Sequence, residues 1–441
     1  MKVKYKMSLF IFGLFVLMAC KKGDTTTPPE IEVLPPTTTP IPTDPTAPPS
    51  DVPADATIIE LGRGEGEELT IDGGALKVTS NAFIKIKGGR YSSIVIKNIV
   101  APANKPFFIK NDGIVKITNV MHTSNINNVV ISGDNVAGQK YGFQFENISF
   151  RAIMMDGKMN GVTIRNMSFK NVNDYVIAGE KSNGDSFAYK GTAETRTENF
   201  KIINCLFENA GSIAFGGNLN SDTGEDSGLF KNVEVAYNTF INSADVGTLC
   251  SFSNVQDYDI HHNIVNNINA ANNNHNGIFY MQGNGNFHDN KLSNYQGNSI
   301  RMWLYSRGSS PATNEIYNNI CYNTRKYGAF ELQAFTRNIY PGKSTYANAK
   351  VYNNTAGKMN TSHDFEGQVL DLYNTFGSLE YYNNLGFDLN SKKTITNMIN
   401  NMSDTKITRD TNNKYVATQA EAVFDTNTFQ SKYTGIGAPA M

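Results

Sequence analysis

Apolar and polar residues alternate in short segments along most of the chain, and asparagine recurs within and after these segments. Val162–Asn171, with the sequence VTIRNMSFKN, and Phe200–Asn209, with the sequence FKIINCLFEN, match position for position. A period of two is the pattern of β-strands with one buried face, and no stretch shows a sustained helical period. The pattern therefore predicts an all-β protein built from short strands.

The same motif recurs along the chain, each time anchored on one asparagine. Successive anchors lie 19 to 38 residues apart, as expected where stacked repeats share a fixed core and carry loops of different length. Asparagine suits the left-handed backbone of a tight bend, and stacked asparagine side chains can hydrogen-bond to one another. We therefore expect one β-solenoid. Its anchors are Asn98, Asn119, Asn147, Asn166, Asn204, Asn238, Asn263, Asn290, Asn319, Asn354 and Asn384.

An apolar residue lies two positions before the second asparagine of each clear repeat, and we expect these residues to form one interior row. Cys321 takes a place in this row, and Cys205 falls on the same inward side of its strand. Together with Cys250 they show no metal-binding or disulfide spacing, so we expect three buried thiols. The interior row consists of Phe169, Phe207, Phe240, Val265, Leu292 and Cys321.

This repeat resembles that of the pectate-lyase-like right-handed parallel β-helix proteins, which carry a short asparagine-containing bend between two strands of each coil. The resemblance covers about residues 58–389. It implies a right-handed parallel β-helix in a single elongated domain, with a polysaccharide groove beside the strand that follows the longer turn. The superfamily includes lyases, hydrolases, epimerases and proteins without known activity, so the fold alone does not name a reaction.

The start of the chain has the order of a secretory leader. Three lysines precede an apolar run from Met7 to Met18 that is too short to span a membrane. Leu17–Cys20, with the sequence LMAC, resembles a bacterial lipobox, which implies a removed signal peptide and a lipid on Cys20. Residues 25–53 then hold ten of the fifteen prolines, a composition typical of an extended tether.

These patterns predict four parts of the chain. They are a lipoprotein signal peptide at 1–19, the lipidated cysteine and its Pro/Thr-rich tether at 20–54, the β-helix at 55–400 and a C-terminal cap segment at 401–441. We expect a monomer in the cell envelope, anchored in the outer membrane through Cys20 on the periplasmic or the outer face. The formal net charge is −1, and the sequence has no basic block that could follow a phosphate backbone. Nucleic acid is therefore not an expected partner.

One predicted face collects polar and aromatic side chains on consecutive repeats. Aromatic rings can stack on sugar rings while amide and charged groups bind hydroxyls, so the row suits a polysaccharide. A solvated sheet face that binds no ligand is the simpler alternative. The side chains predicted to point outward are Tyr280, Gln282, Arg301, Trp303, Tyr305, Glu331, Gln333, Asp371 and Tyr373.

The leading hypothesis for this face is cleavage of a uronate-containing glycan by β-elimination. That chemistry needs a base for the C5 proton and a positive group, or Ca²⁺, beside the substrate carboxylate. Arg301 is the first candidate for the positive group, and Glu331 or Asp371 could bind Ca²⁺ or orient Arg301. The catalytic candidates are Arg301, Glu331, Asp371 and His275. The substrate-binding candidates are Trp303, Tyr280, Gln282, Tyr305, Gln333, Arg307 and Arg337.

Two other hypotheses stay open. A glycan-binding or surface-adhesion protein without catalysis needs only the aromatic and amide side chains. A glycoside hydrolase needs converging carboxylates, for which Glu331, Asp371, Asp364 and Glu366 are available, although no polygalacturonase-like motif is present. For His261, His262 and His288 we expect a packing role, and His363, in a loop before the Asp371 strand, is a secondary candidate.

Overall fold

The computed structural model describes residues 52, 55–78, 81–157, 159–180, 196–219, 226–307, 309–335, 346–390 and 398–440. The chain divides into two compact units, Met1–Ala47 and Pro48–Met441, and every described residue lies in the second unit. The predicted signal peptide, Cys20 and nearly all of the tether lie outside the described residues. No helix in the described ranges has the length and apolar character that a membrane crossing requires.

The described part of the chain is nearly all β, which confirms the predicted fold class at this level. One network of 33 strands is joined by parallel pairings, and strands β15 and β16 form a small antiparallel pair. The first elements are β1 (Thr57–Leu61), β2 (Glu68–Asp72), α1 (Gly73–Leu76), β3 (Ala82–Val100), β4 (Phe107–Asn127), β5 (Val129–Ser132), β6 (Phe143–Ile148), β7 (Ile153–Asp156), β8 (Thr163–Arg165), β9 (Met167–Val172), β10 (Ile177–Glu180), β11 (Arg196–Glu198), β12 (Lys201–Ile203), β13 (Leu206–Ala210), β14 (Ile213–Phe215), β15 (Asn218–Leu219) and β16 (Asp226–Ser227).

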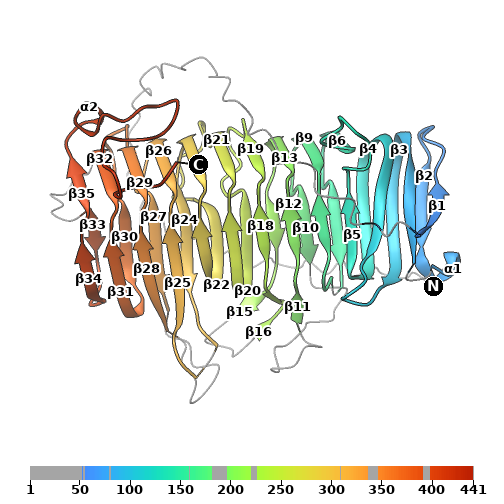
Figure 1. Ribbon diagram of the computed structural model, residues 1–441, viewed down its shortest axis with the longest axis horizontal. Helices are drawn as coiled ribbons and strands as arrows, with labels where there is room; N and C mark the ends of the chain where they lie inside the picture. Colours follow the sequence, from blue (N-terminus) through green and yellow to red (C-terminus); the bar gives the residue numbers. More distant parts are fainter. Residues whose placement is uncertain are drawn as a thin grey trace, which may run out of the picture. The chain divides into compact units, whose positions relative to one another are not determined.

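Later strands repeat the same arrangement, each lying parallel to its equivalent one repeat further on. Figure 1 shows these equivalent strands side by side along the long axis of the view. The later elements are β17 (Leu229–Lys231), β18 (Glu234–Ala236), β19 (Thr239–Ile241), β20 (Cys250–His261), β21 (Ile264–Ile268), β22 (Gly277–His288), β23 (Lys291–Tyr295), β24 (Asn298–Leu304), β25 (Ala312–Tyr317), β26 (Ile320–Thr324), β27 (Phe330–Ala334), β28 (Ala347–Tyr352), β29 (Thr355–Met359), β30 (Leu370–Asn374), β31 (Phe376–Tyr382), β32 (Leu385–Leu389), β33 (Ile399–Asn401), β34 (Lys406–Thr411), β35 (Lys414–Val416) and α2 (Gln419–Ala422).

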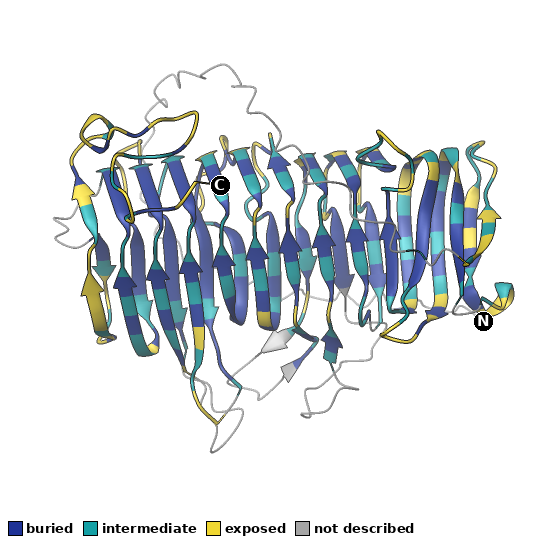
Figure 2. Ribbon diagram, viewed as in Figure 1, coloured by how far each residue is buried: buried dark blue, intermediate teal, exposed yellow. Residues whose placement is uncertain are grey.

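Alternation along the strands sends one set of side chains into a continuous apolar core (Figure 2). The predicted interior row is confirmed. The register pairs Phe169 with Phe207, Phe207 with Phe240 and Phe240 with Val265, and it continues through Leu292 to the sixth member. All six members are buried, and the phenylalanine rings stack 4.6 to 5.0 Å apart. The three predicted buried thiols are likewise fully buried.

Asparagine plays two separate roles at the bends. Asn166 and Asn204 themselves adopt left-handed backbone angles, with φ of 56° and 58°. From Asn238 onward the residue before the anchor is left-handed instead, and the anchor side chain is buried. There each anchor donates from Nδ2 to Oδ1 of the next anchor at 2.9 to 3.1 Å, for example Asn263 to Asn290. The predicted hydrogen-bonded stack of asparagines is thus present, and it keeps these buried amides paired.

The C-terminal part departs from the expected layout. Parallel pairing continues through β33, β34 and β35, past residue 400, where the sequence places the start of a cap. The chain after β35 then folds back along earlier repeats: the Ala438 amide donates to Thr355 Oγ1 at 2.9 Å, and Lys291 Nζ lies 3.8 Å from the centroid of the Phe429 ring. This segment therefore covers the side of several repeats.

Candidate functional site

Four neighbouring parallel strands, β22, β24, β27 and β30, carry the predicted site row. Their register places Tyr280 beside Arg301, Arg301 beside Glu331 and Glu331 beside Asp371. Strands in register stack equivalent side chains at neighbouring positions on one face, so these four residues form one row. A second row on the same strands runs through Gln282, Trp303 and Gln333. The register of Gln282 with Trp303 and of Trp303 with Gln333 places them there.

The prediction that the row points into solvent was wrong for five of its residues. The exposed fractions are 0% for Glu331, 3% for Asp371, 8% for Arg301, 9% for Gln282 and 0% for Tyr305. Neighbouring backbone and side chains cover them. A Cβ atom on Gly277 would lie 2.7 Å from Arg301 Cγ, and one on Gly328 would lie 3.2 Å from Asp371 Oδ2. Arg307 lies over the Tyr305 ring, 5.2 Å from its centroid.

Glu331 is the centre of a buried charged cluster. Arg301 Nε donates to Glu331 Oε1 at 2.8 Å, and His275 Nε2 lies 3.1 Å from Oε2. Burial opposes ionisation of Glu331, but the contact with His275 and the Arg301 charge outweigh it and lower the pKa of this carboxyl. Arg301 also donates from Nη1 to the His275 carbonyl at 3.2 Å. Arg301 therefore holds both the carboxylate and the backbone of His275 in place.

Asp371 lies on the next strand, and its surroundings shift its pKa in the opposite direction to that of Glu331. Burial raises its pKa to about 7, the hydrogen bond from Asn400 opposes this, and the charge of Glu331 raises it further. Gln368 and Asn400 donate to Oδ1, and Asn298 donates to Oδ2. Two adjacent carboxyl groups thus have pKa values pushed apart, with Glu331 ionised and Asp371 able to hold a proton near neutral pH.

His275 is the member of the cluster that reaches the surface, with a side chain that is 27% exposed. Its Nε2 faces two acceptors, Glu331 and, at 2.9 Å, Asn298 Oδ1. The Asn298 amide is oriented by its own donation to the Gly328 carbonyl at 3.1 Å and to Asp371. Nε2 must therefore carry hydrogen, which leaves the lone pair of the neutral ring on Nδ1. These contacts hold the imidazole of His275 in one orientation, with Nε2 toward Glu331 and Asn298.

The loop that carries His275 is held by residues that sequence reasoning missed. Tyr327 stacks on the imidazole with ring centroids 4.2 Å apart, and its φ of 73° is rare for a bulky residue. Arg325 donates to Asn273 Oδ1 and to the carbonyls of Asn269 and Asn272. No sequence signal marks Arg325, but the Tyr-Gly step at 327–328 marks an unusual bend.

Aromatic side chains from both rows lie beside this cluster. Trp303 and Tyr280 are half-buried and meet edge to face with centroids 5.0 Å apart, and Phe335 packs 4.7 Å from Trp303. Gln333 is half-buried beside them. Arg307 donates from Nη2 to Asn254 Oδ1 at 2.6 Å. The remaining predicted substrate-binding residue, Arg337, lies outside the described residues.

The two buried carboxylates do not fit the expected Ca²⁺ site. Calcium takes six to eight oxygen ligands, chiefly carboxylates, carbonyls and water. Glu331 instead faces the cation Arg301 and the imidazole of His275, while amide N–H groups point at Asp371. This donor set stabilises one negative charge and one protonated carboxyl and does not offer the oxygen ligands of Ca²⁺.

The sequence matches no protein-family model and no curated protein. The resemblance to pectate-lyase-like proteins therefore rests on the repeat alone.

Proposed function

We propose that this protein is a right-handed parallel β-helix of the pectate-lyase-like kind, anchored to the cell envelope through a lipid on Cys20, that cleaves a uronate-containing polysaccharide by β-elimination. Support for the fold comes from parallel pairing between equivalent strands of successive repeats and from the buried asparagine stack. Support for the anchor comes from the lipobox-like sequence before Cys20 and from the proline-rich segment that follows it.

One observation carries the proposed chemistry. The imidazole of His275 is 27% exposed, and its Nε2 lies 3.1 Å from the buried, ionised carboxylate of Glu331, beside the half-buried rings of Tyr280 and Trp303. A carboxylate behind a histidine fixes its tautomer and stabilises the imidazolium that forms when the ring takes a proton. Nearby aromatic surface is what a sugar polymer needs for stacking.

In this mechanism, Nδ1 of His275 removes the C5 proton beside the uronate carboxylate. The electron pair of the C–H bond forms the C4=C5 double bond, and the C4–O bond breaks, with its oxygen taking a proton from solvent. Glu331 stabilises the resulting imidazolium. Arg301, first expected to act on the substrate, is a positioning residue here, because Glu331 and the His275 carbonyl already engage its guanidinium.

The first test is a screen of the purified protein against uronate polymers and neutral glycans, following ultraviolet-absorbing unsaturated products and new reducing ends in parallel. With an active uronate polymer, His275→Ala should lower product formation by about 100- to 10,000-fold while glycan affinity is retained. The matched control is His122→Ala, which removes a histidine that also pairs with a carboxylate on the same face. If both variants keep full activity, His275 is not the base.

A glycan-binding protein without catalysis is the second candidate, and the complete burial of Glu331 favours it, since buried ion networks also serve structure alone. This candidate function predicts that the protein binds a glycan and releases no cleavage products. New reducing ends without absorbance would instead favour a hydrolase, for which the split pKa values of Glu331 and Asp371 would supply a base and an acid.

A further inference from the structure

A second group of titratable side chains lies at a bend on another side of the same repeats. In seven consecutive repeats, the residue before the stacked asparagine is left-handed, with φ between 52° and 57°. Asparagine fills this position in the later repeats, where a polar side chain with a tolerance for positive φ is sufficient. These residues are Tyr237, His262, Asp289, Asn318, Asn353, Asn383 and Asn412.

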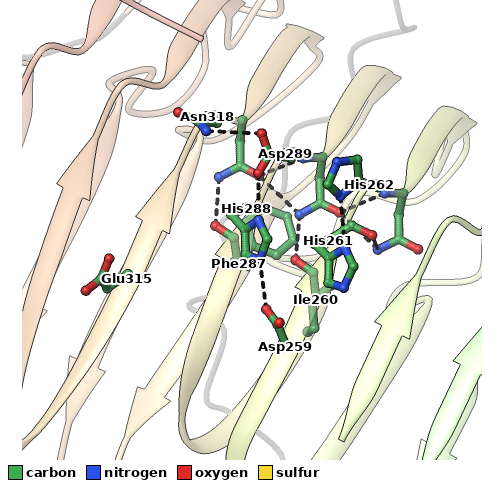
Figure 3. Close-up of polar contacts among 12 residues, drawn as sticks. Asp259, Ile260, His261, His262, Phe287, His288, Asp289, Glu315 and Asn318 are labelled. Carbon is green, nitrogen blue, oxygen red and sulfur yellow. Dashed lines mark hydrogen bonds and ion pairs between the residues drawn. The ribbon is translucent and has the colours of Figure 1, made fainter. Parts of the chain in front are cut away.

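Two consecutive repeats carry a histidine and an aspartate at this left-handed position, and both residue types can bind metals. His262, His288 and Asp289 each offer one ligand atom, and these three atoms lie within 4.8 Å of one another. His262 is exposed, while His288 and Asp289 are half-buried, so solvent reaches the group. Figure 3 shows these side chains gathered at the bend, with Asp259 beyond His288.

Contacts around His288 leave one ring nitrogen directed toward Asp289. His288 Nε2 lies 2.8 Å from Asp259 Oδ1, and Nδ1 lies 2.6 Å from Asp289 Oδ2. The ring is clamped between His261 and Tyr317, with centroids 5.0 and 4.5 Å away. A carboxylate that accepts from one imidazole nitrogen while the other binds an ion is the usual support of a metal-binding histidine.

The other ligands are supported as well. Asp289 Oδ1 accepts from Asn318 Nδ2 at 3.1 Å, which leaves Oδ2 turned toward His288. His262 Nδ1 lies 2.9 Å from His261 Nδ1. Tetrahedral ligand atoms about 2.0 to 2.2 Å from an ion lie about 3.3 to 3.6 Å from one another, so an ion would replace the short contact between His288 and Asp289 and would need these two atoms to separate by about 0.7 to 1.0 Å.

We propose that His262, His288 and Asp289 bind a Zn²⁺ ion, with water in the remaining coordination position. Two imidazoles and one carboxylate match the ligand preference of zinc and other late first-row metals, whereas Ca²⁺ and Mg²⁺ prefer oxygen ligands alone. The bound ion joins the bend after β20 to the bend after β22. This site is separate from His275 and does not depend on the proposed glycan chemistry.

Isothermal titration of ZnCl₂ into the chelator-treated full chain, carrying no histidine tag, tests this proposal. We expect one ion per chain in the wild-type protein, and an affinity at least about tenfold weaker in His262→Asn and in Asp289→Asn. Asparagine suits both positions, because it occupies the same left-handed bend in the following repeats. Circular dichroism confirms that the variants are folded.

His363→Asn is the matched control, since His363 is also exposed and left-handed, with φ of 56°. It should leave zinc affinity unchanged. Replacing zinc by Co²⁺ gives a second readout, because the visible absorption of the bound ion should change in His262→Asn and not in the control. The proposal is overturned if the wild-type protein takes up no zinc, or if both site variants bind it as tightly as the wild-type protein does.

Discussion

Two histidine–carboxylate pairs on the same face of the strand network have different surroundings. His122 on β4 contacts Asp156 on β7 at 2.7 Å, and the two side chains are 38% and 27% exposed. His275 lies 3.1 Å from Glu331, whose side chain is 0% exposed. The first pair is solvated on both sides, whereas the second has an accessible histidine in front of a carboxylate that water does not reach.

The strands do not cause this difference, because His122 and Arg301 occupy equivalent outward positions in the stacked repeats. Near His122 the next outward neighbours are the uncharged residues Met154 and Ala178. Near His275 the neighbours are charged, and loops lie over them. A β-stack thus fixes which residues share a row, while the loops set the dielectric environment in which the row acts.

The largest expected effect comes from removing the buried carboxylate. Glu331→Ala leaves Arg301 with an unpaired buried charge, so the free energy of unfolding should fall by about 3 to 5 kcal/mol. Denaturant unfolding followed by circular dichroism measures this change. A loss below about 1 kcal/mol would mean that the cluster is as well solvated as the pair at His122.

A slightly smaller effect should appear in the pH dependence of stability. The pKa of Asp371 is about 7 when folded and near 3.8 when unfolded, so the folded state binds more protons between these values. The free energy of unfolding should therefore fall as pH rises from about 4 to 7, by about 4 kcal/mol at most, and level off above. Subtracting the profile of Asp371→Asn isolates this contribution, and identical profiles would contradict it.

Removal of the only tryptophan should show whether glycan binding is localised to the region around His275. Trp303→Ala should weaken affinity for the glycan that the screen identifies by about 1 to 2 kcal/mol, because the half-buried indole offers stacking surface on this face. Phe150→Ala removes an aromatic ring that is 53% exposed elsewhere in the chain and is the control. Equal losses in both variants would argue against a localised binding face.

The smallest effect is expected at the solvated pair. Asp156→Ala should change the free energy of unfolding by about 0 to 1 kcal/mol, since water screens both partners. The same denaturant titration measures it beside Glu331→Ala. A loss as large as that of Glu331→Ala would show that exposure does not explain the contrast between the two pairs.

The sequence predicted which strand residues share the row of the site, but not the contacts that surround them. Alternation placed Arg301, Glu331 and Asp371 on one face, and the register brings them together. The sequence prediction did not include Asn298, Gln368 and Asn400, whose amides donate to Asp371 from β24, from the turn before β30 and from β33. Nor does it show that Tyr327 stacks on His275.

By itself, the sequence determined the strands, the interior rows and the order of residues along each row. The reason is local: side chains alternate every two residues, and apolar burial selects one register, as at Phe207 and Phe240. Only the tertiary structure decided which outward residues are buried and how their charges are set. Burial of Glu331 and Asp371, and the orientation of His275, depend on contacts between segments far apart in the chain, which no local pattern encodes.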